Sequence, residues 1–130
     1  MKSKERIILQ KISNYVRDVL QYVQGYTFEQ FMIDKKTISA CAFTVSQMGE
    51  LANHISPETQ SEYAHIPWKS VRGMRNRIVH DYENIDLVVL WGTITSSLPE
   101  FQKQIEEILL RQTQETDILS PIEDEEEYER

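Results

Sequence analysis

Apolar residues recur at intervals of three and four along most of the chain, which is the spacing of one face of an α-helix. This pattern predicts helices over residues 5–24 and 34–54, a third that starts at Pro67, and a fourth over residues 87–98 that continues after Pro99. No segment alternates apolar and polar residues in the manner of a half-buried strand. We therefore expect an all-α fold, an antiparallel up-and-down bundle of four to five helices.

Residues at the helix ends support these boundaries. Gly25 is suited to a helix C-terminus, and Thr27 with Gln30 has the spacing of a capping box that opens a short turn. Asn84 or Asp86 can cap the fourth helix. Residues 58–67 contain turn formers without a sustained period, so the sequence predicts a loop there after Ser56-Pro57.

The chain has 130 residues, of which 40% are hydrophobic, and this favours one globular domain, expected over residues 1–118. The formal charge of −7 is concentrated at the end, where IEDEEEYER holds six acids and one arginine. We expect residues 119–130 to form a solvated, disordered tail. The alternative is a phosphate mimic that competes for a basic patch in the body of the protein.

The sequence predicts a cytoplasmic protein. A single cysteine, Cys41, cannot form an internal disulfide and looks like a small core residue in a reducing compartment. The longest apolar run, residues 87–91, is far too short to span a bilayer, and the start of the chain does not resemble a signal peptide.

Residues 68–82 form the basic patch of an otherwise acidic chain. On one continuous helix, an apolar stripe would face the bundle, and a polar face beside it would suit an anion or a phosphodiester. The stripe consists of Trp68, Val71, Met74, Ile78 and, if the helix continued, Tyr82. The polar face consists of Lys69, Arg72, Gly73, Asn76 and His80. A plain solvated face is the alternative, and it is the preferred interpretation for Lys69 and Arg72.

On such a continuous helix Arg75 falls on the apolar stripe, where an unpaired guanidinium is costly. It would need a partner, which could be Glu50, a ligand phosphate or a second subunit. On a straight helix Arg75 and His80 point about 140° apart. Either the helix ends near Val79 so that His80 turns round, or two such helices face each other across a twofold axis. We favour the second arrangement, which predicts a homodimer.

These residues resemble a known motif. Arg75, Asn76 and His80 match the Arg-polar-x3-His pattern of HEPN domains, and Tyr82 extends it to the RxxxxHxY form of the HepT toxins. The resemblance covers roughly residues 5–110. Outside the motif it includes the early ERI, the pair Gly49-Glu50, Trp68, and the pattern of Ile85, Asp86, Trp91, Leu98 and Pro99.

The resemblance implies a metal-independent endoribonuclease that is the toxin of a type VII-like two-gene system. Its antitoxin, MntA, would be a minimal nucleotidyltransferase that transfers AMP to the motif tyrosine, here Tyr82. Arg75 and His80 would then be catalytic, with Asn76 supporting them. Lys69, Arg72 and Arg77 would bind the RNA phosphates. A histidine can take the proton from an RNA 2′-hydroxyl and a guanidinium can stabilise the phosphorane, so a 2′,3′-cyclic phosphate and a 5′-hydroxyl are the expected ends.

Other chemistries find little support in the sequence. CxxC, HExxH, GxxxxGK, GxGxxG and GxSxG motifs and the nucleotidyltransferase signature are absent, so we expect no metal and no cofactor. His54 and His65 are predicted to be surface residues. Two alternatives to a nuclease stay open. One is a HEPN-like module that binds a nucleotide or a protein without cleavage, with Arg75, Asn76 and His80 holding a phosphate. The other is a structural bundle in which Arg75 pairs with Glu50.

Overall fold

The computed structural model of the protein describes residues 1–80 and 84–118, and within them it is all-α, as the sequence predicts. Tyr82 and the predicted tail, residues 119–130, lie outside the described residues. In chain order the elements are α1 (Ser3–Tyr22), α2 (Phe28–Met32), α3 (Lys35–Ala52), α4 (Pro57–Glu62), α5 (Trp68–Arg72), α6 (Met74–Ile78), α7 (Leu87–Gly92), the π-helical segment η1 (Thr93–Ser97) and α8 (Leu98–Ile118).

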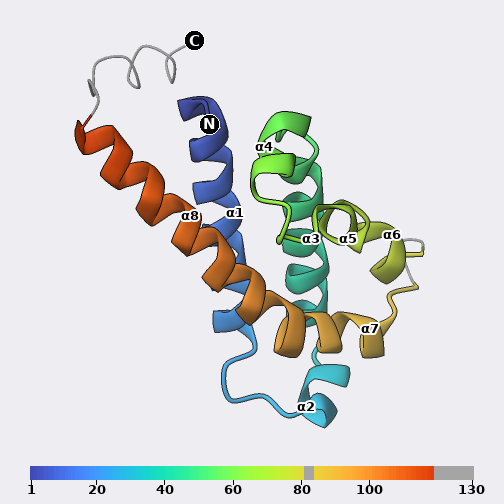
Figure 1. The fold of residues 1–130 in the computed structure, drawn as a ribbon. Helices are drawn as coiled ribbons and strands as arrows, with labels where there is room; N and C mark the ends of the chain where they lie inside the picture. The colour runs from blue at the N-terminus through green and yellow to red at the C-terminus, as the bar shows by residue number, and fades with distance from the viewer. Residues whose placement is uncertain (81–83, 119–130) are drawn as a thin grey trace.

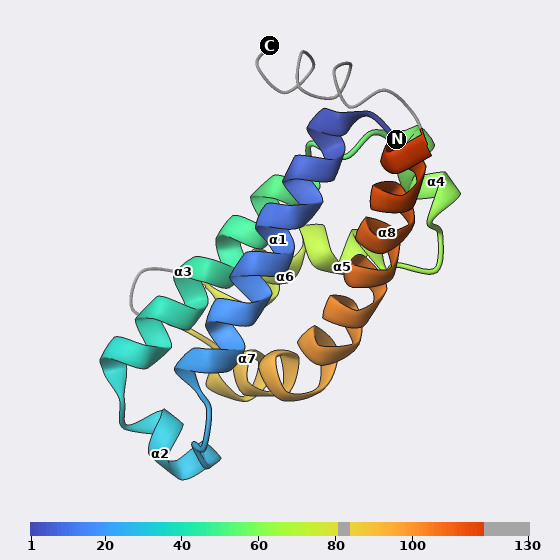
Figure 2. The same cartoon turned by 90° about the vertical axis from the view of Figure 1, so that its left-hand side faces the viewer.

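Three long helices form the body of the bundle. α1 packs against both α3 and α8 and runs antiparallel to them (Figure 1). The short helices α4 to α7 connect the end of α3 to the start of α8, and α5 and α6 pack against α3 (Figure 2). One continuous apolar core joins these elements. Its largest fully buried side chains include Leu9, Ile12, Phe31, Met48, Ile66, Ile78, Leu90, Ile94, Leu98, Ile105 and Ile108.

The local signals at most helix ends are confirmed. Gly25 has φ +80°, which glycine adopts without the strain that a side chain would cause. Thr27 and Gln30 form both bonds of a capping box, because each backbone N–H donates to the other side chain, at 2.9 and 3.2 Å. Asp86, one of the two candidate caps, caps α7 through a carboxylate oxygen that accepts from Val89 N. Asp34, which the sequence analysis did not identify as a cap, accepts in the same way from Thr37 N at the start of α3.

The loop predicted for residues 58–67 is wrong in its first half, which is helix α4. Ser56 is the N-cap of this helix and Pro57 its first residue, so the pair that was interpreted as the end of one helix also begins the next. Glu5 of α1 completes this helix start. Its buried carboxylate accepts hydrogen bonds from Ser56 N at 2.6 Å and from Thr59 Oγ1 at 2.9 Å.

Candidate active site

The histidine of the motif lies just outside a helix. Helix α6 carries Arg75 and ends at Ile78, and Val79 is extended with φ −107° and ψ 105°. An isolated antiparallel bridge joins Val79 to Ile85. The backbone N–H of His80 donates to the carbonyl of Asn84 at 2.8 Å, and that of Asp86 donates to the carbonyl of Ile78 at 2.8 Å. These contacts place His80 just beyond helix α6, with its backbone paired to Asn84.

This geometry corresponds to the first of the two arrangements considered from the sequence, in which the helix ends near Val79. His80 is no longer on the helix that carries Arg75, so the separation of about 140° on a straight helix does not apply. Both side chains are exposed to solvent. The helix end at Ile78 thus removes the straight-helix objection to a site within one subunit, and the homodimer stays a prediction.

The predicted burial of Arg75 is wrong. Trp68, Val71, Met74 and Ile78 are buried as predicted, but the Arg75 side chain is exposed and donates from Nη1 to Asn76 Oδ1 at a long 3.5 Å. Within the described part of the chain, no ion pair joins Arg75 to the exposed Glu50. A break at Gly73 separates α5 from α6, but Met74 and Ile78 beyond it are still buried as the spacing predicts, so the break alone does not explain the exposure of Arg75.

Close packing of α3 against α5 accompanies this break. A Cβ atom added to Gly49 would lie 3.2 Å from the carbonyl oxygen of Val71 and 3.4 Å from that of Arg72. Glycine therefore allows α3 to approach the last turn of α5 at backbone distance. Because α6 follows directly after Gly73, this contact helps to fix where the motif helix begins.

Substitution of Gly49 by alanine is expected to destabilise the protein by about 1 kcal/mol, because an overpacking cost of roughly 1–3 kcal/mol exceeds the helix-propensity gain of about 1 kcal/mol. Gly92 provides the matched control, since a Cβ there has open space and the residue is helical, with φ −61° and ψ −40°. Gly92→Ala should stabilise by roughly 0.5–1 kcal/mol. Urea denaturation of both variants measures the difference. Equal stabilisation by the two alanines would contradict the close packing at Gly49.

The three predicted phosphate-binding residues divide between two places. Lys69 is exposed, and Arg72 is half-buried and donates from Nη1 to Gln60 Oε1 of α4 at 2.6 Å. Both line a shallow depression of about 530 Å³ between α4 and α5. Arg77 is exposed and donates from Nη1 to the carbonyl of Ser70 at 3.0 Å. It lines a second cavity, which lies between the α5–α6 segment and the start of α8. Arg72 thus has a structural partner that the sequence did not predict.

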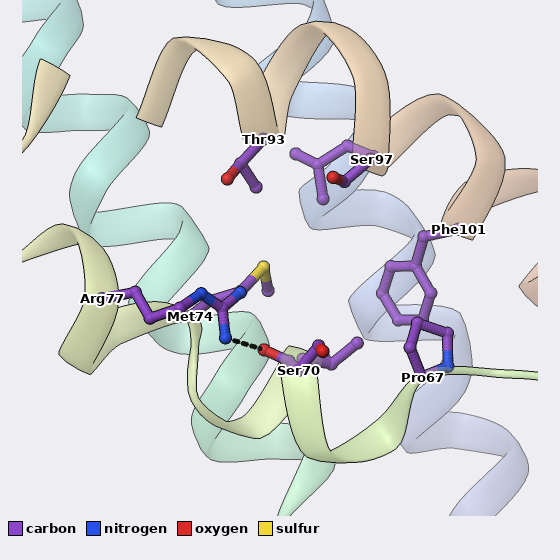
Figure 3. Close-up of a pocket in the computed structure, with 9 residues that line it drawn as sticks. Pro67, Ser70, Met74, Arg77, Thr93, Ser97 and Phe101 are labelled. Atoms are coloured by element: carbon purple, nitrogen blue, oxygen red, sulfur yellow. Dashed lines mark hydrogen bonds between the residues drawn. The ribbon is translucent and has the colours of Figure 1, made fainter. Parts of the chain in front are cut away.

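The second cavity was not foreseen from the sequence. It has a volume of about 350 Å³ and lies between the α5–α6 segment and the start of α8 (Figure 3). One side consists of Pro67, Ser70, Val71, Met74 and Arg77. The other side consists of Thr93, Ser97, Leu98 and Phe101. No sequence signal aligns these two segments, although the spacing of four between Thr93 and Ser97 is that of residues on one helix face.

Cys41 is buried, and burial raises the pKa of its thiol to about 12, so it stays protonated at neutral pH and does not act as a nucleophile. Among the described residues, no three His, Cys, Asp or Glu side chains gather closely enough to hold a metal ion. Likewise, none of the described helices combines the length and apolar character needed to cross a membrane.

The fold and the motif together define a small all-α domain in which an arginine on a short helix is followed by a histidine in the adjoining loop. Residues 12–108 match the family model described as Ribonuclease HepT-like, and the chain therefore belongs to this family. This agrees with the resemblance to HepT that the motif residues indicated.

Named relatives agree with this membership. A candidate RNase of Caldanaerobacter subterraneus is 29% identical over 107 residues, which cover 82% of this chain and 96% of the relative. A candidate RNase of Methanocaldococcus jannaschii is 28% identical, covering 83% of this chain and 89% of the relative. A candidate ribonuclease HepT of Thermococcus cleftensis is 27% identical, covering 83% of this chain and 98% of the relative. No solved structure matches the chain significantly.

Proposed function

We propose that this protein is a metal-independent endoribonuclease in which Arg75 and His80 are the catalytic residues. The observation that carries the proposal is the position of His80, which the Val79–Ile85 bridge holds outside helix α6, exposed, in the loop that follows Arg75. Membership of the HepT-like ribonuclease family supports RNA as the substrate.

The reaction would use a nucleophile that belongs to the RNA. His80 takes the proton of a 2′-hydroxyl, whose oxygen attacks the adjacent phosphorus. The O2′–P bond forms, the P–O5′ bond breaks, and the leaving 5′ oxygen takes up a proton. The products are a 2′,3′-cyclic phosphate and a 5′-hydroxyl. No metal is needed to generate the nucleophile, because imidazole is a sufficient base at neutral pH.

Arg75 would stabilise the charge that develops on the phosphorane oxygens. Its guanidinium is exposed, and its long contact with Asn76 leaves most of its N–H groups available to a phosphate. Asn76 would support Arg75 by orienting it through this contact. Lys69 and Arg72, which line the depression between α4 and α5, would add phosphate contacts along the RNA backbone.

The family membership also supports a role as the toxin of a two-gene system. In this proposal an MntA-type nucleotidyltransferase antitoxin inactivates the protein. The Tyr82 hydroxyl attacks the α-phosphorus of ATP, so that a Tyr–AMP bond forms and pyrophosphate leaves. Tyr82 follows His80 by two residues in the sequence, so an added AMP would bring its negative charge and bulk close to the catalytic groups. A homodimer remains part of the proposal.

End-group analysis of a defined RNA, cleaved by the purified protein in the presence of EDTA, tests the nuclease. Fragments with 2′,3′-cyclic phosphate and 5′-hydroxyl ends are expected. Ends with a 3′-hydroxyl and a 5′-phosphate, or activity that EDTA removes, would exclude this mechanism. Binding of the RNA without any cleavage would favour the non-catalytic binding module instead.

Intact mass of the protein, expressed with and without the neighbouring nucleotidyltransferase gene, tests the antitoxin proposal. One or more AMP units that appear only with the neighbour, and disappear in Tyr82→Phe, are expected. Loss of toxicity on coexpression without any added mass would instead indicate inhibition by binding.

A further inference from the structure

The cavity of about 350 Å³ between α5–α6 and η1–α8 has an unusual wall. Thr93 and Ser97 are the first and last residues of η1, which is a π-helical segment of five residues. π-Helical turns are rare and are frequently found at functional sites. Here the π-helical segment supplies two hydroxyl groups to a cavity whose other wall is provided by α5 and the motif helix α6 (Figure 3).

The interior of this cavity is apolar, and its polar groups lie at the sides. Val71, Met74, Leu98 and Phe101 are buried side chains of the wall. In Figure 3 the guanidinium of Arg77 lies on one side, and the Thr93 and Ser97 hydroxyls lie on the opposite side. This volume and this mixture of an apolar interior with a few polar groups are typical of sites for small-molecule ligands.

From this arrangement we propose that the cavity binds one unstacked base of the RNA substrate and prefers guanine; this rests on the proposed function. Helix α6 carries Met74 and Arg77 into the cavity wall and exposes Arg75 and Asn76. A base in the cavity would therefore belong to a nucleotide close to the one whose phosphate Arg75 contacts. Recognition of single-stranded RNA commonly uses such splayed bases, packed against aromatic and apolar side chains.

The preference for guanine follows from the donors and acceptors of the two sides. Arg77 can donate only, and guanine presents two adjacent acceptors, O6 and N7, that arginine matches well. On the opposite side, Thr93 Oγ1 already donates to the carbonyl of Val89 at 2.8 Å, so toward a ligand it can only accept. Guanine offers N1–H and N2–H donors to such an acceptor. On the edge that would face Arg77, adenine presents an N6 donor beside its N7 acceptor, where guanine presents two acceptors.

Binding of nucleotides to the full-length protein tests the cavity independently of cleavage. The methyl signal of Met74, inside the cavity, is followed by NMR during titration with the 3′-monophosphates of guanosine, adenosine, cytidine and uridine. Exposed Met32 of α2 serves as the internal control. A saturable shift of the Met74 methyl signal is expected, with guanosine 3′-monophosphate binding at least about fivefold more tightly than the other three nucleotides, which is the discrimination of one good base contact.

No shift of the Met74 signal, or equal affinities for all four nucleotides, overturns the proposal. A shift that depends on protein concentration without nucleotide also overturns it, because a second copy would then fill the cavity.

Cleavage by a variant with a blocked cavity provides the second readout. Ser97→Phe places a ring at the cavity wall, and Ser96→Phe puts the same ring on a neighbouring exposed residue of η1 that does not line the cavity. Wild type is expected to cut a defined RNA next to guanosine. Ser97→Phe should lose this bias and raise KM about tenfold with little change in kcat, and Ser96→Phe should behave as wild type.

A second variant and two further results distinguish failure of the base-binding proposal from failure of the nuclease proposal. If Ser97→Phe does not fold, Arg77→Met at an exposed position removes the guanidinium and should abolish the guanosine bias. Cleavage without base preference in the wild type overturns the base-binding proposal and leaves the nuclease standing. Binding of guanosine 3′-monophosphate at Met74 without any RNA cleavage supports the cavity and overturns the proposed function.

Discussion

His80→Ala is expected to lower RNA cleavage by about 10²–10⁴-fold, which is the usual contribution of one general base. The melting temperature should not change, because the imidazole is exposed and the loop is held by backbone bonds that alanine keeps. His54→Ala is the matched control, since His54 is an exposed histidine just beyond the end of α3. Initial rates on a defined RNA, together with circular dichroism, measure both effects. Full activity in His80→Ala would remove His80 from the mechanism.

Arg75→Ala separates the nuclease from the structural alternative in the same assay. Loss of an electrostatic stabiliser should lower the cleavage rate by roughly 10²–10³-fold. Because the side chain is exposed and makes one long contact, the free energy of unfolding should stay within about 0.5 kcal/mol of wild type. A pronounced loss of stability would instead indicate that Arg75 has a structural partner.

Glu5→Ala should have the largest effect on stability, lowering the free energy of unfolding by about 3 kcal/mol. Its carboxylate accepts two hydrogen bonds at the start of α4, and removal of charge-assisted bonds of this kind costs roughly 1.5 kcal/mol or more each. The substitution also leaves the Ser56 N–H without its acceptor. The corresponding shift in melting temperature is on the order of 10 °C.

Thermal denaturation of Glu5→Ala and Glu107→Ala measures this difference, because Glu107 is an exposed glutamate on α8 and its loss should be nearly neutral. Similar melting temperatures for the two variants would show that Glu5 does not hold α4. Since Gln60 of α4 accepts a hydrogen bond from Arg72, loosening α4 should also weaken RNA binding through the depression between α4 and α5.

The features that sequence analysis predicted correctly are local ones. Capping by Thr27 and Asp86 involves partners three residues away, so the relevant chemistry is visible in a short stretch of sequence. The burial of Trp68 and Ile78 follows in the same way from helical spacing.

The features that were missed depend on distant segments. Helix α4 begins with help from Glu5, which is 51 residues from Ser56 along the chain. The close approach of α3 to the end of α5 brings Gly49 to the carbonyls of Val71 and Arg72, which are distant from it along the chain. The cavity needs α5–α6 and η1–α8 to face each other, which no periodicity can reveal.

The brevity of α5 and α6 has a consequence during synthesis of the protein. A helix of five residues is unstable in isolation, because its first turn costs more conformational entropy than its few hydrogen bonds recover. These helices therefore depend on apolar surface from α3 and α7, and α7 leaves the ribosome after them. Arg75 and His80 acquire their arrangement only once that later part of the chain has emerged, so on the proposed function we expect a nascent chain that still lacks α7 to be inactive toward the RNA that surrounds it.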